Sequence, residues 1–244
     1  MGRILAVVYG ALCYLVYLPI SLYAVGFVGG LVVPKTVDSG PAVAWQQALL
    51  ADALLLGLFA VQHSVMARPG FKRWWTAIVP AHAERSTYVL LTSLVLLLLF
   101  WRWQPMPAVV WNVENRAGRS VLVGLFWLGW AIVFASTFFI NHFDLFGLRQ
   151  VVLHLRGRAY TDPPFTRAVL YRFVRHPLML GFIIAFWAAP RMSVGHLLFA
   201  AAGTGYILIG LWFEERDLLA VHGDAYRRYR KEVPMLIPLP RGRA

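Results

Sequence analysis

The sequence predicts an all-α protein, a polytopic membrane helical bundle. Of the 244 residues, 59% are hydrophobic and only 14% are charged, whereas about 25% of the residues in ordinary soluble domains are charged. The mean hydropathy is +0.63. The hydrophobic residues form long runs, and the basic residues lie in the short segments between those runs. This arrangement is typical of an integral membrane protein.

Six apolar segments are separated by polar or Pro- and Gly-rich breaks. A helix needs about 20 residues to cross a bilayer, so the first, second, fourth and sixth segments are long enough and the third is slightly short. The fifth segment is shorter still, and we expect it to form a tight helical hairpin with the sixth. The segments are 4–33, 42–66, 86–101, 119–140, 177–190 and 194–214.

The first segment and the single cysteine exclude several alternatives. The segment is longer than the roughly 7–15 apolar residues of a signal peptide, so we expect it to be a retained first span. Cys13 is the only cysteine, which excludes an internal disulfide and a metal site built from several cysteines. The histidines also lack the spacing of a catalytic zinc motif. The sequence therefore predicts no metal.

The net charge of +12 is explained by membrane topology rather than by nucleic-acid binding. Short loops on the cytoplasmic side of membrane proteins carry an excess of lysine and arginine. With six crossings, 18 of the 23 basic residues fall on one side of the membrane. We therefore expect both termini to be cytoplasmic, the lipid bilayer to be a partner, and nucleic acid not to be one.

A basic pair precedes the fifth apolar segment, in the run Arg175-His176-Pro177-Leu178-Met179-Leu180-Gly181. Proline suits the first turn of a helix, where its missing N–H costs nothing. Arg175 and His176 would then lie beside free backbone N–H groups and the positive end of the helix dipole, which favours an anionic ligand. A positively charged cap on a membrane helix is an equal alternative.

Two acids, Glu214 and Glu215, end the sixth segment. Acids at the C-terminus of a helix oppose its dipole, so a positive group should compensate them. Arg175 and His176 would lie at the same membrane level if the last two segments form a hairpin. We therefore expect a polar site there, although an ordinary charged helix end is the alternative.

The tail after the sixth segment carries Tyr226, Tyr229 and Arg230. On a helix the two tyrosines share a face, and Arg230 follows Tyr226 by four residues. This pattern fits either a membrane-surface anchor or a lid that closes over a ligand from the cytoplasm.

The loop after the fourth segment concentrates polar groups in ten residues. His142 and Asp144 are two residues apart and are followed by Arg149 and Gln150. A lone histidine there would be an interfacial residue, but a His–Asp pair followed by Arg and Gln suits proton transfer. These four residues are the candidate catalytic groups.

Asp52 and His63 lie on one face of the second segment, because eleven residues are close to three helical turns. An ionisable group within a membrane is costly and normally faces the bundle interior. For Asp52 we favour a structural role over a functional one.

The motifs taken together resemble the isoprenylcysteine carboxyl methyltransferase superfamily. They are Arg175-His176-Pro177 with Gly181, then Glu214-Glu215, then Gly223, Tyr226 and Tyr229 followed by Val233-Pro234. Residues 143–150 and 186–199 are similar to a narrower branch, the bacterial methanethiol S-methyltransferases, and with the N-terminal helices this resemblance covers nearly the whole chain. Met179 departs from the pattern, since the superfamily often has an aromatic residue at that position.

The resemblance implies S-adenosylmethionine as cofactor, bound at the cytoplasmic ends of the last helices without a Rossmann domain. Arg175, His176, Pro177, Leu178 and Gly181 would form one side of the pocket. The acids and the tail would form the other, with Glu214 and Glu215 on the ammonium and ribose, and Tyr226, Tyr229 and Arg230 over the adenine. Residues 1–140 would be N-terminal membrane helices, and 141–244 the cofactor-binding loop, hairpin and lid of one integral membrane domain.

The resemblance also implies methyl transfer to a small volatile thiol, methanethiol, giving dimethyl sulfide at the cytoplasmic face of a bacterial-type inner membrane. The thiol must lose a proton, because the thiolate is the nucleophile. His142 or Asp144 would accept the proton and Arg149 would lower the pKa of the thiol. Gln150 completes this candidate set.

Three other functions remain as alternatives. They are an isoprenylcysteine carboxyl methyltransferase, a non-catalytic membrane protein of the same superfamily, and a proton-coupled transporter built on Asp52 and His63. The transporter lacks a visible inverted repeat. The presence of Arg-His-Pro, of Glu-Glu and of the tail tyrosines favours an enzyme.

Overall fold

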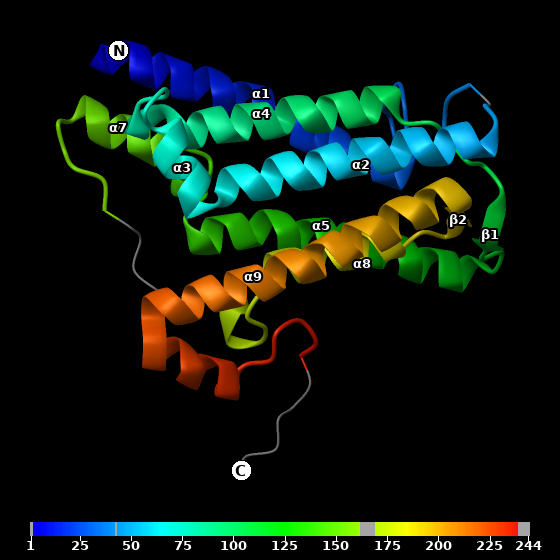
Figure 1. Ribbon diagram of the computed structural model, residues 1–244. Coiled ribbons are helices and arrows are strands. Elements are labelled where there is room, and N and C mark those ends of the chain that lie inside the picture. The colour runs from blue at the N-terminus through cyan, green and yellow to red at the C-terminus, as the bar shows by residue number, and fades with distance from the viewer. Residues whose placement is uncertain (1, 42, 162–168, 239–244) are drawn as a thin grey trace. The chain divides into compact units, whose positions relative to one another are not determined.

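The computed structural model describes residues 2–41, 43–161 and 169–238, which are mostly helical (Figure 1). It divides into two compact units. The first combines Met1–Ala108 with Asn141–Pro164, and the second combines Val109–Ile140 with Phe165–Ala244. The loop that carries the candidate catalytic residues therefore belongs to the first unit, and the basic pair, the two acids and the tail belong to the second.

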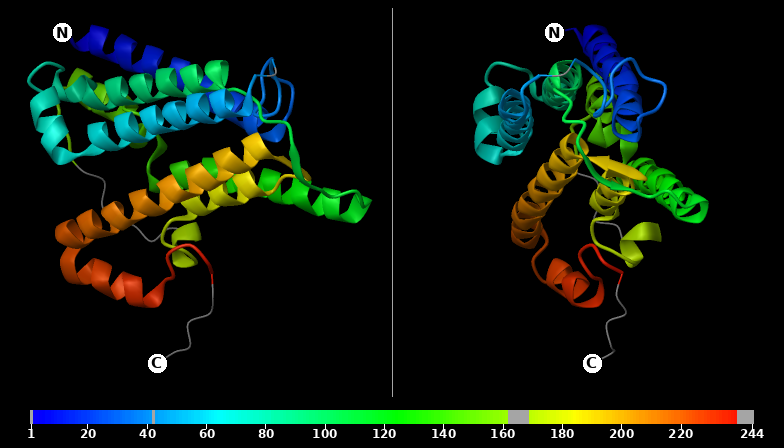
Figure 2. Two further views of the ribbon diagram at one scale, coloured as in Figure 1. Left: turned by 45° about the vertical axis from the view of Figure 1, so that its right-hand side comes forward. Right: turned by 90° about the vertical axis from the view of Figure 1, so that its right-hand side faces the viewer.

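The first unit is a helical bundle centred on one helix. Helix α4 packs against α1, α2 and α7, and α1 also packs against α7; α1, α2 and α4 run side by side in Figures 1 and 2. The helices are α1 (Arg3–Gly29), α2 (Trp45–Ala67), α3 (Pro69–Trp75), α4 (Ala81–Arg102), α6 (His142–Leu145) and α7 (Leu148–Leu155).

The second unit is built around a short central helix. Helix α8 packs against both α5 and α9, and the strands β1 and β2 pair antiparallel, with Asn112 opposite Arg191. The elements are β1 (Val109–Asn112), α5 (Arg116–Ile140), the 3₁₀ turn η1 (Val169–Arg172), α8 (Pro177–Trp187), β2 (Arg191–Ser193) and α9 (Val194–Glu232).

The surfaces of the long helices suit a lipid environment. On α2 an exposed row of apolar side chains recurs every three or four residues, at Leu50, Leu54, Leu58, Val61 and Val65, which is one stripe of a helix. In the described part of the chain, five helices are long and apolar enough to cross a membrane, namely α1, α2, α4, α5 and α9. The predicted polytopic membrane helical bundle is confirmed, whereas six crossings and a cytoplasmic C-terminus stay predictions.

Two helices differ from the sequence-based bounds, and two short strands were not expected. Helix α4 begins at Ala81, five residues before the apolar run, because the polar residues up to Arg85 are also helical. Helix α9 continues well beyond Glu214 for the same reason. The two short strands were not predicted, since three or four residues of apolar and polar sequence carry too weak a pattern.

Helices α5 and α8 approach each other closely at two glycines. A Cβ atom on Gly181 would lie 2.6 Å from the carbonyl oxygen of Gly129, and a Cβ on Gly129 would lie 2.7 Å from the carbonyl oxygen of Gly181. No side chain fits between the two backbones at this crossing, as in membrane helix pairs with small residues at the interface. The crossing holds α8, and with it the basic pair, against α5.

A glycine breaks the long helix α9. Gly223 has φ 51° and ψ −124°, a backbone conformation that residues other than glycine rarely adopt. The chain turns back at this point, and Figure 2 shows the last part of α9, orange to red, running back below the preceding part of the same helix. The turn brings the Tyr226 hydroxyl to the Glu215 carboxylate.

The two ionisable groups of α2, Asp52 and His63, each have a contact within the first unit, although Oδ2 of Asp52 is buried without a hydrogen bond. Asp52 is fully buried, and its Oδ1 accepts a hydrogen bond from the backbone N–H of Gln104 at 2.8 Å. The ring of His63 contacts the hydroxyl of Tyr88 on α4, with Nδ1 at 2.9 Å. One contact connects α2 to the segment that directly follows α4, and the other connects α2 to α4 itself. A structural role for Asp52 requires such a contact between elements.

Candidate active site

The basic pair lies where η1 leads into α8. His176 is the residue before the helix, and Pro177 occupies the first turn, as the sequence predicts. The backbone N–H groups of Arg175 and His176 donate to the carbonyl oxygens of Pro234 and Met235, at 2.9 and 3.2 Å. The two side chains are also buried. The start of α8 is therefore fastened to the segment that follows α9.

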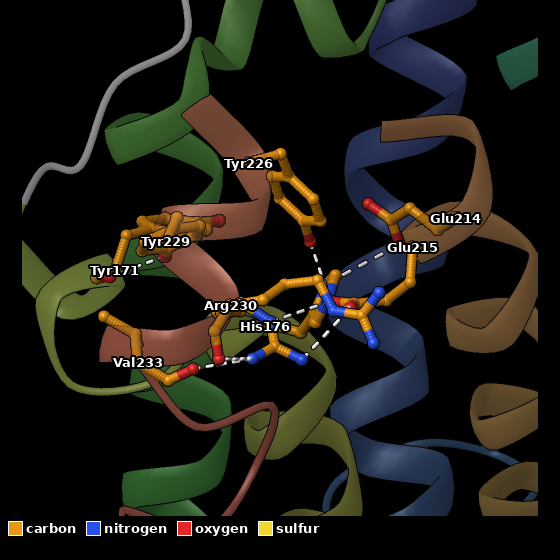
Figure 3. Close-up of polar contacts among 9 residues, drawn as sticks. Tyr171, His176, Glu214, Glu215, Tyr226, Tyr229, Arg230 and Val233 are labelled. Carbon is orange, nitrogen blue, oxygen red and sulfur yellow. Dashed lines mark hydrogen bonds and ion pairs between the residues drawn. The ribbon is translucent and has the colours of Figure 1, made fainter. Parts of the chain in front are cut away.

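The carboxylate of Glu215 is the centre of the polar cluster, and it accepts hydrogen bonds and ion pairs from four side chains. Arg175 binds it with two nitrogens, Nε to Oε1 at 2.8 Å and Nη2 to Oε2 at 3.0 Å. The other distances are 2.8 Å from His176 Nε2 to Oε1, 2.7 Å from the Tyr226 hydroxyl to Oε1, and 3.0 Å from Arg230 Nε to Oε2. Figure 3 shows the side chains of His176, Tyr226 and Arg230 converging on Glu215.

Glu215 lies beyond the part of α9 that can cross the bilayer. The apolar part of α9 runs from Val194 to Phe213, which is about the 20 residues that a crossing needs. Burial of the Glu215 carboxyl would raise its pKa, but hydrogen bonds from His176, Arg175 and Tyr226 outweigh burial and lower the pKa to about 2. The carboxylate is therefore charged at neutral pH, and its charge is neutralised within the cluster.

The tail tyrosines are packed inside the second unit. Tyr226 and Tyr229 are 1% and 2% exposed, and their rings meet edge to face with centroids 5.8 Å apart. Burial and the hydrogen bond to Glu215 raise the pKa of the Tyr226 phenol. Tyr229 donates to the carbonyl oxygen of Tyr171 at 2.6 Å (Figure 3). The tail is thus held by buried hydrogen bonds and by packing.

The neighbouring acid is placed differently. The side chain of Glu214 is 48% exposed, and its Oε2 lies 3.7 Å from Nδ1 of His176. Burial, and then the charge of Glu214, raise the pKa of the Tyr171 phenol. Glu214 therefore presents a carboxylate at the edge of the cluster, whereas the carboxylate of Glu215 is enclosed by donors.

The remaining motif residues of α8 contribute mainly packing. Pro177 is buried, and Leu178 and Met179 are half-buried. Gly181 lies in the close crossing with α5. The structure thus brings all ten predicted cofactor residues into the second unit. They lie directly before α8, in α8, and in α9 on both sides of Gly223.

The four candidate catalytic residues lie in the first unit, around α6 and α7. His142 is 7% exposed, and its Nε2 lies 2.6 Å from the hydroxyl of Tyr14 on α1. Arg149 Nη1 donates to Oδ1 of Asp144 at 2.8 Å. Gln150 donates to the backbone carbonyl of Asp144 at 3.1 Å. Burial lowers the pKa of His142, which keeps the imidazole neutral near neutral pH.

The Asp144–Arg149 pair also fastens the chain that follows α7. The guanidinium of Arg149 donates to the carbonyl and the hydroxyl oxygens of Thr161, at 2.7 and 3.2 Å. Asp144 further accepts a hydrogen bond from the Tyr160 hydroxyl at 3.2 Å. Both oxygens of the Asp144 carboxylate are therefore engaged within the first unit.

Sequence reasoning missed two tyrosines. Tyr171 lies outside every motif, and no sequence signal separates it from other tyrosines. Tyr14 could have been found, because a hydroxyl in the middle of an apolar helix must find a hydrogen-bond partner. Among the residues that the structure describes, no group of three or more His, Cys, Asp or Glu could hold a metal ion.

Comparison with known proteins gives the family. The model of the NnrU protein family matches residues 52–213. The chain is 62% identical to a methanethiol S-methyltransferase of Mycobacterium tuberculosis over 240 residues, which cover 98% of each chain. It is 56% identical to methanethiol S-methyltransferase 1 of Bradyrhizobium diazoefficiens, over 97% of this chain and 83% of the relative. The chain belongs to the NnrU protein family and to the family of the methanethiol S-methyltransferases.

This family relationship confirms the resemblance and the enzyme class that the sequence predicts, a methyltransferase. A more distant relative, the protein nurim of Bos taurus, is 28% identical over 190 residues, covering 74% of this chain and 71% of nurim. No solved structure gives a significant match to the chain. As a member of a methyltransferase family, the protein requires a methyl donor.

Proposed function

We propose that this protein transfers a methyl group from S-adenosylmethionine to methanethiol and so forms dimethyl sulfide. The observation that carries the proposal is the extent of the similarity to proteins named methanethiol S-methyltransferase. It reaches 50–62% identity over nearly the whole chain in the relatives from M. tuberculosis, B. diazoefficiens and Crocosphaera subtropica. Because these alignments cover 97–98% of this chain, both polar clusters lie within the aligned region.

The charged cluster of the second unit has the groups that S-adenosylmethionine needs. The donor carries a carboxylate, an ammonium and ribose hydroxyls, and when bound it supplies the methyl group of its sulfonium. Glu214 would bind a cationic or hydroxyl group, because its carboxylate is half-exposed. His176, at the start of α8, would bind the carboxylate together with backbone N–H groups of the helix. Pro177, Leu178 and Gly181 would shape the pocket wall.

Within this cluster we assign Glu215 and Arg175 to holding the pocket together. Their charged atoms already satisfy one another, and Arg175 also donates to the carbonyl oxygen of Val233 at 2.6 Å. Tyr226 and Arg230 bind the same carboxylate from the tail. This network would keep the tail, including Tyr229, against α8 while the donor is bound.

The polar loop of the first unit would act on the thiol. A thiol becomes a good nucleophile only as the thiolate, so a group must accept its proton. His142 is neutral and buried, which suits a base, while Asp144 is paired with Arg149. Arg149 binds the Asp144 carboxylate, and Gln150 donates to the Asp144 backbone carbonyl, so both side chains would hold the loop in place.

We further propose that the protein lies in a bacterial-type inner membrane with both termini and the active site at the cytoplasmic face. The support is the distribution of lysine and arginine, most of which fall on the side of the termini if there are six crossings. A small apolar thiol partitions into the bilayer, so it would reach the enzyme between the helices. Residues 141–244 would carry most of the donor-binding function.

The direct test is an assay of the purified protein in detergent. S-adenosylmethionine and methanethiol are added, and dimethyl sulfide is measured in the headspace. Product formation supports the proposal. Normal donor binding by calorimetry without product would contradict methanethiol as acceptor, and methylation of a prenylated cysteine carboxylate instead would favour the prenyl-cysteine activity. Absence of donor binding would contradict the methyltransferase reaction itself.

Variants test the assignment of the two clusters. Glu214→Ala should abolish donor binding, because it removes the exposed carboxylate next to His176. Asp224→Ala is the matched control, since Asp224 is an exposed acid of the same helix that pairs only at the surface with Arg227. Asp144→Ala should spare donor binding and slow turnover. Unchanged donor affinity in Glu214→Ala would move the donor site away from this cluster.

A further inference from the structure

The hydroxyl of Tyr14 forms a close contact with His142 that the sequence does not suggest. The two residues are 128 positions apart, and the phenol oxygen lies 2.6 Å from the imidazole Nε2. Tyr14 lies within the apolar helix α1, where a hydroxyl without a partner costs free energy. A phenol is a strong donor to a neutral imidazole nitrogen, so the pair forms a short hydrogen bond between α1 and the start of α6.

Aromatic rings surround this pair. The His142 ring meets the rings of Tyr14, Phe143 and Phe146 at centroid distances of 5.7, 5.5 and 4.8 Å. Tyr17, one turn further along α1, stacks on Phe146 at 4.0 Å. Sulfur atoms contact aromatic rings favourably, and an uncharged small thiol needs no counter-charge. The surroundings of the pair therefore suit a neutral thiol.

Three charged side chains near the pair have hydrogen-bond partners of their own. From α4, Arg85 donates to the carbonyl oxygen of Leu145 at 2.7 Å. From α7, Arg149 binds Asp144, and Asp144 also accepts from Tyr160. Burial alone lowers the pKa of His142. The imidazole is thus neutral near neutral pH and can take up a proton, whereas both oxygens of the Asp144 carboxylate already accept hydrogen bonds.

We propose that Tyr14 relays the proton of the thiol substrate to His142. The S–H bond breaks as its proton moves to the phenol oxygen, while the phenol proton moves to Nε2 of the imidazole. The products are a thiolate, an intact phenol and an imidazolium, so charge and protons balance. The thiolate would then be the nucleophile for the methyl group, the donor sulfonium would leave as a neutral thioether, and the imidazolium would release its proton through Tyr14 to water. The proposal rests on the function proposed above and uses residues of the first unit only.

The test compares Tyr14→Phe with Tyr17→Phe. The first variant keeps the ring and removes the hydroxyl that binds His142. The second removes a hydroxyl from the same group of rings and serves as the matched control. At pH 7 we expect kcat/KM for methanethiol to fall about 100-fold in Tyr14→Phe, the order of one general-base contribution, and to change little in Tyr17→Phe. Donor affinity by calorimetry should stay at the wild-type value in both.

The pH profile separates a relay from a structural effect. Alkyl thiols ionise in solution at higher pH, cysteine thiols with a pKa of about 8.5, so the need for a relay falls as the pH rises. The deficit of Tyr14→Phe should therefore shrink from pH 7 to pH 10. In addition, the double variant Tyr14→Phe with His142→Gln should be no slower than either single variant, because the two groups act in one step.

Two results would overturn the relay. One is wild-type kcat/KM in Tyr14→Phe, and the other is a deficit that stays constant with pH and adds to that of His142→Gln. Both presuppose a wild-type protein that forms dimethyl sulfide. Failure of the wild-type protein to form it would contradict the proposed function instead, so the two failures are distinguishable.

Discussion

The two polar clusters of this protein are built on opposite principles. In the second unit, the Glu215 carboxylate is enclosed by two arginines, a histidine and a phenol, so every contact involves a charged group. In the first unit, His142 is enclosed by aromatic rings and one phenol, and burial keeps it neutral. Opposite charges pair around Glu215, whereas the His142 ring contacts aromatic groups, and the ion pair of this unit lies further along the loop, between Asp144 and Arg149.

The difference matches two kinds of ligand. A charged ligand such as S-adenosylmethionine needs compensating charges, and these must be held in place so that they do not collapse on one another. A small neutral thiol needs little more than apolar contact and one group that takes its proton. The chemistry of each cluster therefore indicates which substrate it would handle, and the following predictions test that division.

The largest effect is expected from Glu215→Gln. This change leaves the buried guanidinium of Arg175 without its carboxylate, and breaking a buried pair in this way costs about 3–5 kcal/mol of unfolding free energy. Glu214→Gln is the matched control, because its side chain is 48% exposed and exposed pairs contribute about 0–1 kcal/mol. Unfolding in detergent measures both. Equal losses of stability in the two variants would contradict the separate roles of the adjacent acids.

A second prediction concerns the acid side of the stability profile. The pKa of Glu215 is lower in the folded protein than its ordinary value of 4.5, so the stability from its charge is complete above pH 4.5 and is lost as the pH falls toward 2. The pKa of His142 is lowered from 6.5, so the unfolded chain takes up this proton first and stability begins to fall below pH 6.5.

Unfolding temperature as a function of pH checks both windows. Glu215→Gln should lose the decline between pH 4.5 and 2, and His142→Gln should lose the decline that begins near pH 6.5. Each variant should keep the window that belongs to the other cluster. An unchanged acid profile in Glu215→Gln would show that its charge does not stabilise the fold.

A smaller effect on stability is expected from a change in the close crossing of α5 and α8. In Gly181→Ala the new Cβ would meet the carbonyl oxygen of Gly129 at 2.6 Å, so α5 and α8 must separate, at a cost of about 1–3 kcal/mol. Gly205→Ala is the control, since nothing lies within 4 Å of a Cβ there, and the change should stabilise α9 by up to about 1 kcal/mol. Stability measurements in detergent should show opposite signs for the two variants.

The smallest effect distinguishes the two tail tyrosines. Tyr229→Phe removes a neutral hydrogen bond to the Tyr171 carbonyl and should cost about 1 kcal/mol. Tyr226→Phe removes a hydrogen bond to the charged Glu215 and should cost about 1.5–3 kcal/mol. The order of the two unfolding free energies is the measurement, and the reverse order would contradict the central role of Glu215.

Much of the fold follows from the sequence because membrane helices carry a long apolar signal. The start of α8 at Pro177 and the start of α9 at Val194 agree with the predicted segments. Helix lengths were less predictable where polar residues continue the helix, as at Ala81–Arg85 and after Glu214. Hydropathy reports the lipid-facing stretch, whereas a helix ends where its hydrogen bonds end.

The candidate site was predictable in its members but not in its pairing. Compensation of the two acids by Arg175 and His176 follows from the helix dipole and from charge, but the sequence treats Glu214 and Glu215 alike. Only the direction of each side chain on α9 shows that one is enclosed and the other exposed. The apolar surroundings of Tyr14 indicate that its hydroxyl needs a partner, but they do not identify His142, which is 128 positions away, because pairings over such separations leave no local pattern.

The reversal at Gly223 has a consequence for how the protein is made. Glu215 receives Arg175 and His176 from α8, but Tyr226 and Arg230 reach it only after the chain has turned back. During synthesis the acid is therefore incompletely partnered until residue 230 has left the ribosome and docked. Docking of the segment after Gly223 against Glu215 is therefore a late step of biogenesis. A chain interrupted before Arg230 would leave the Glu215 carboxylate with only part of its partners.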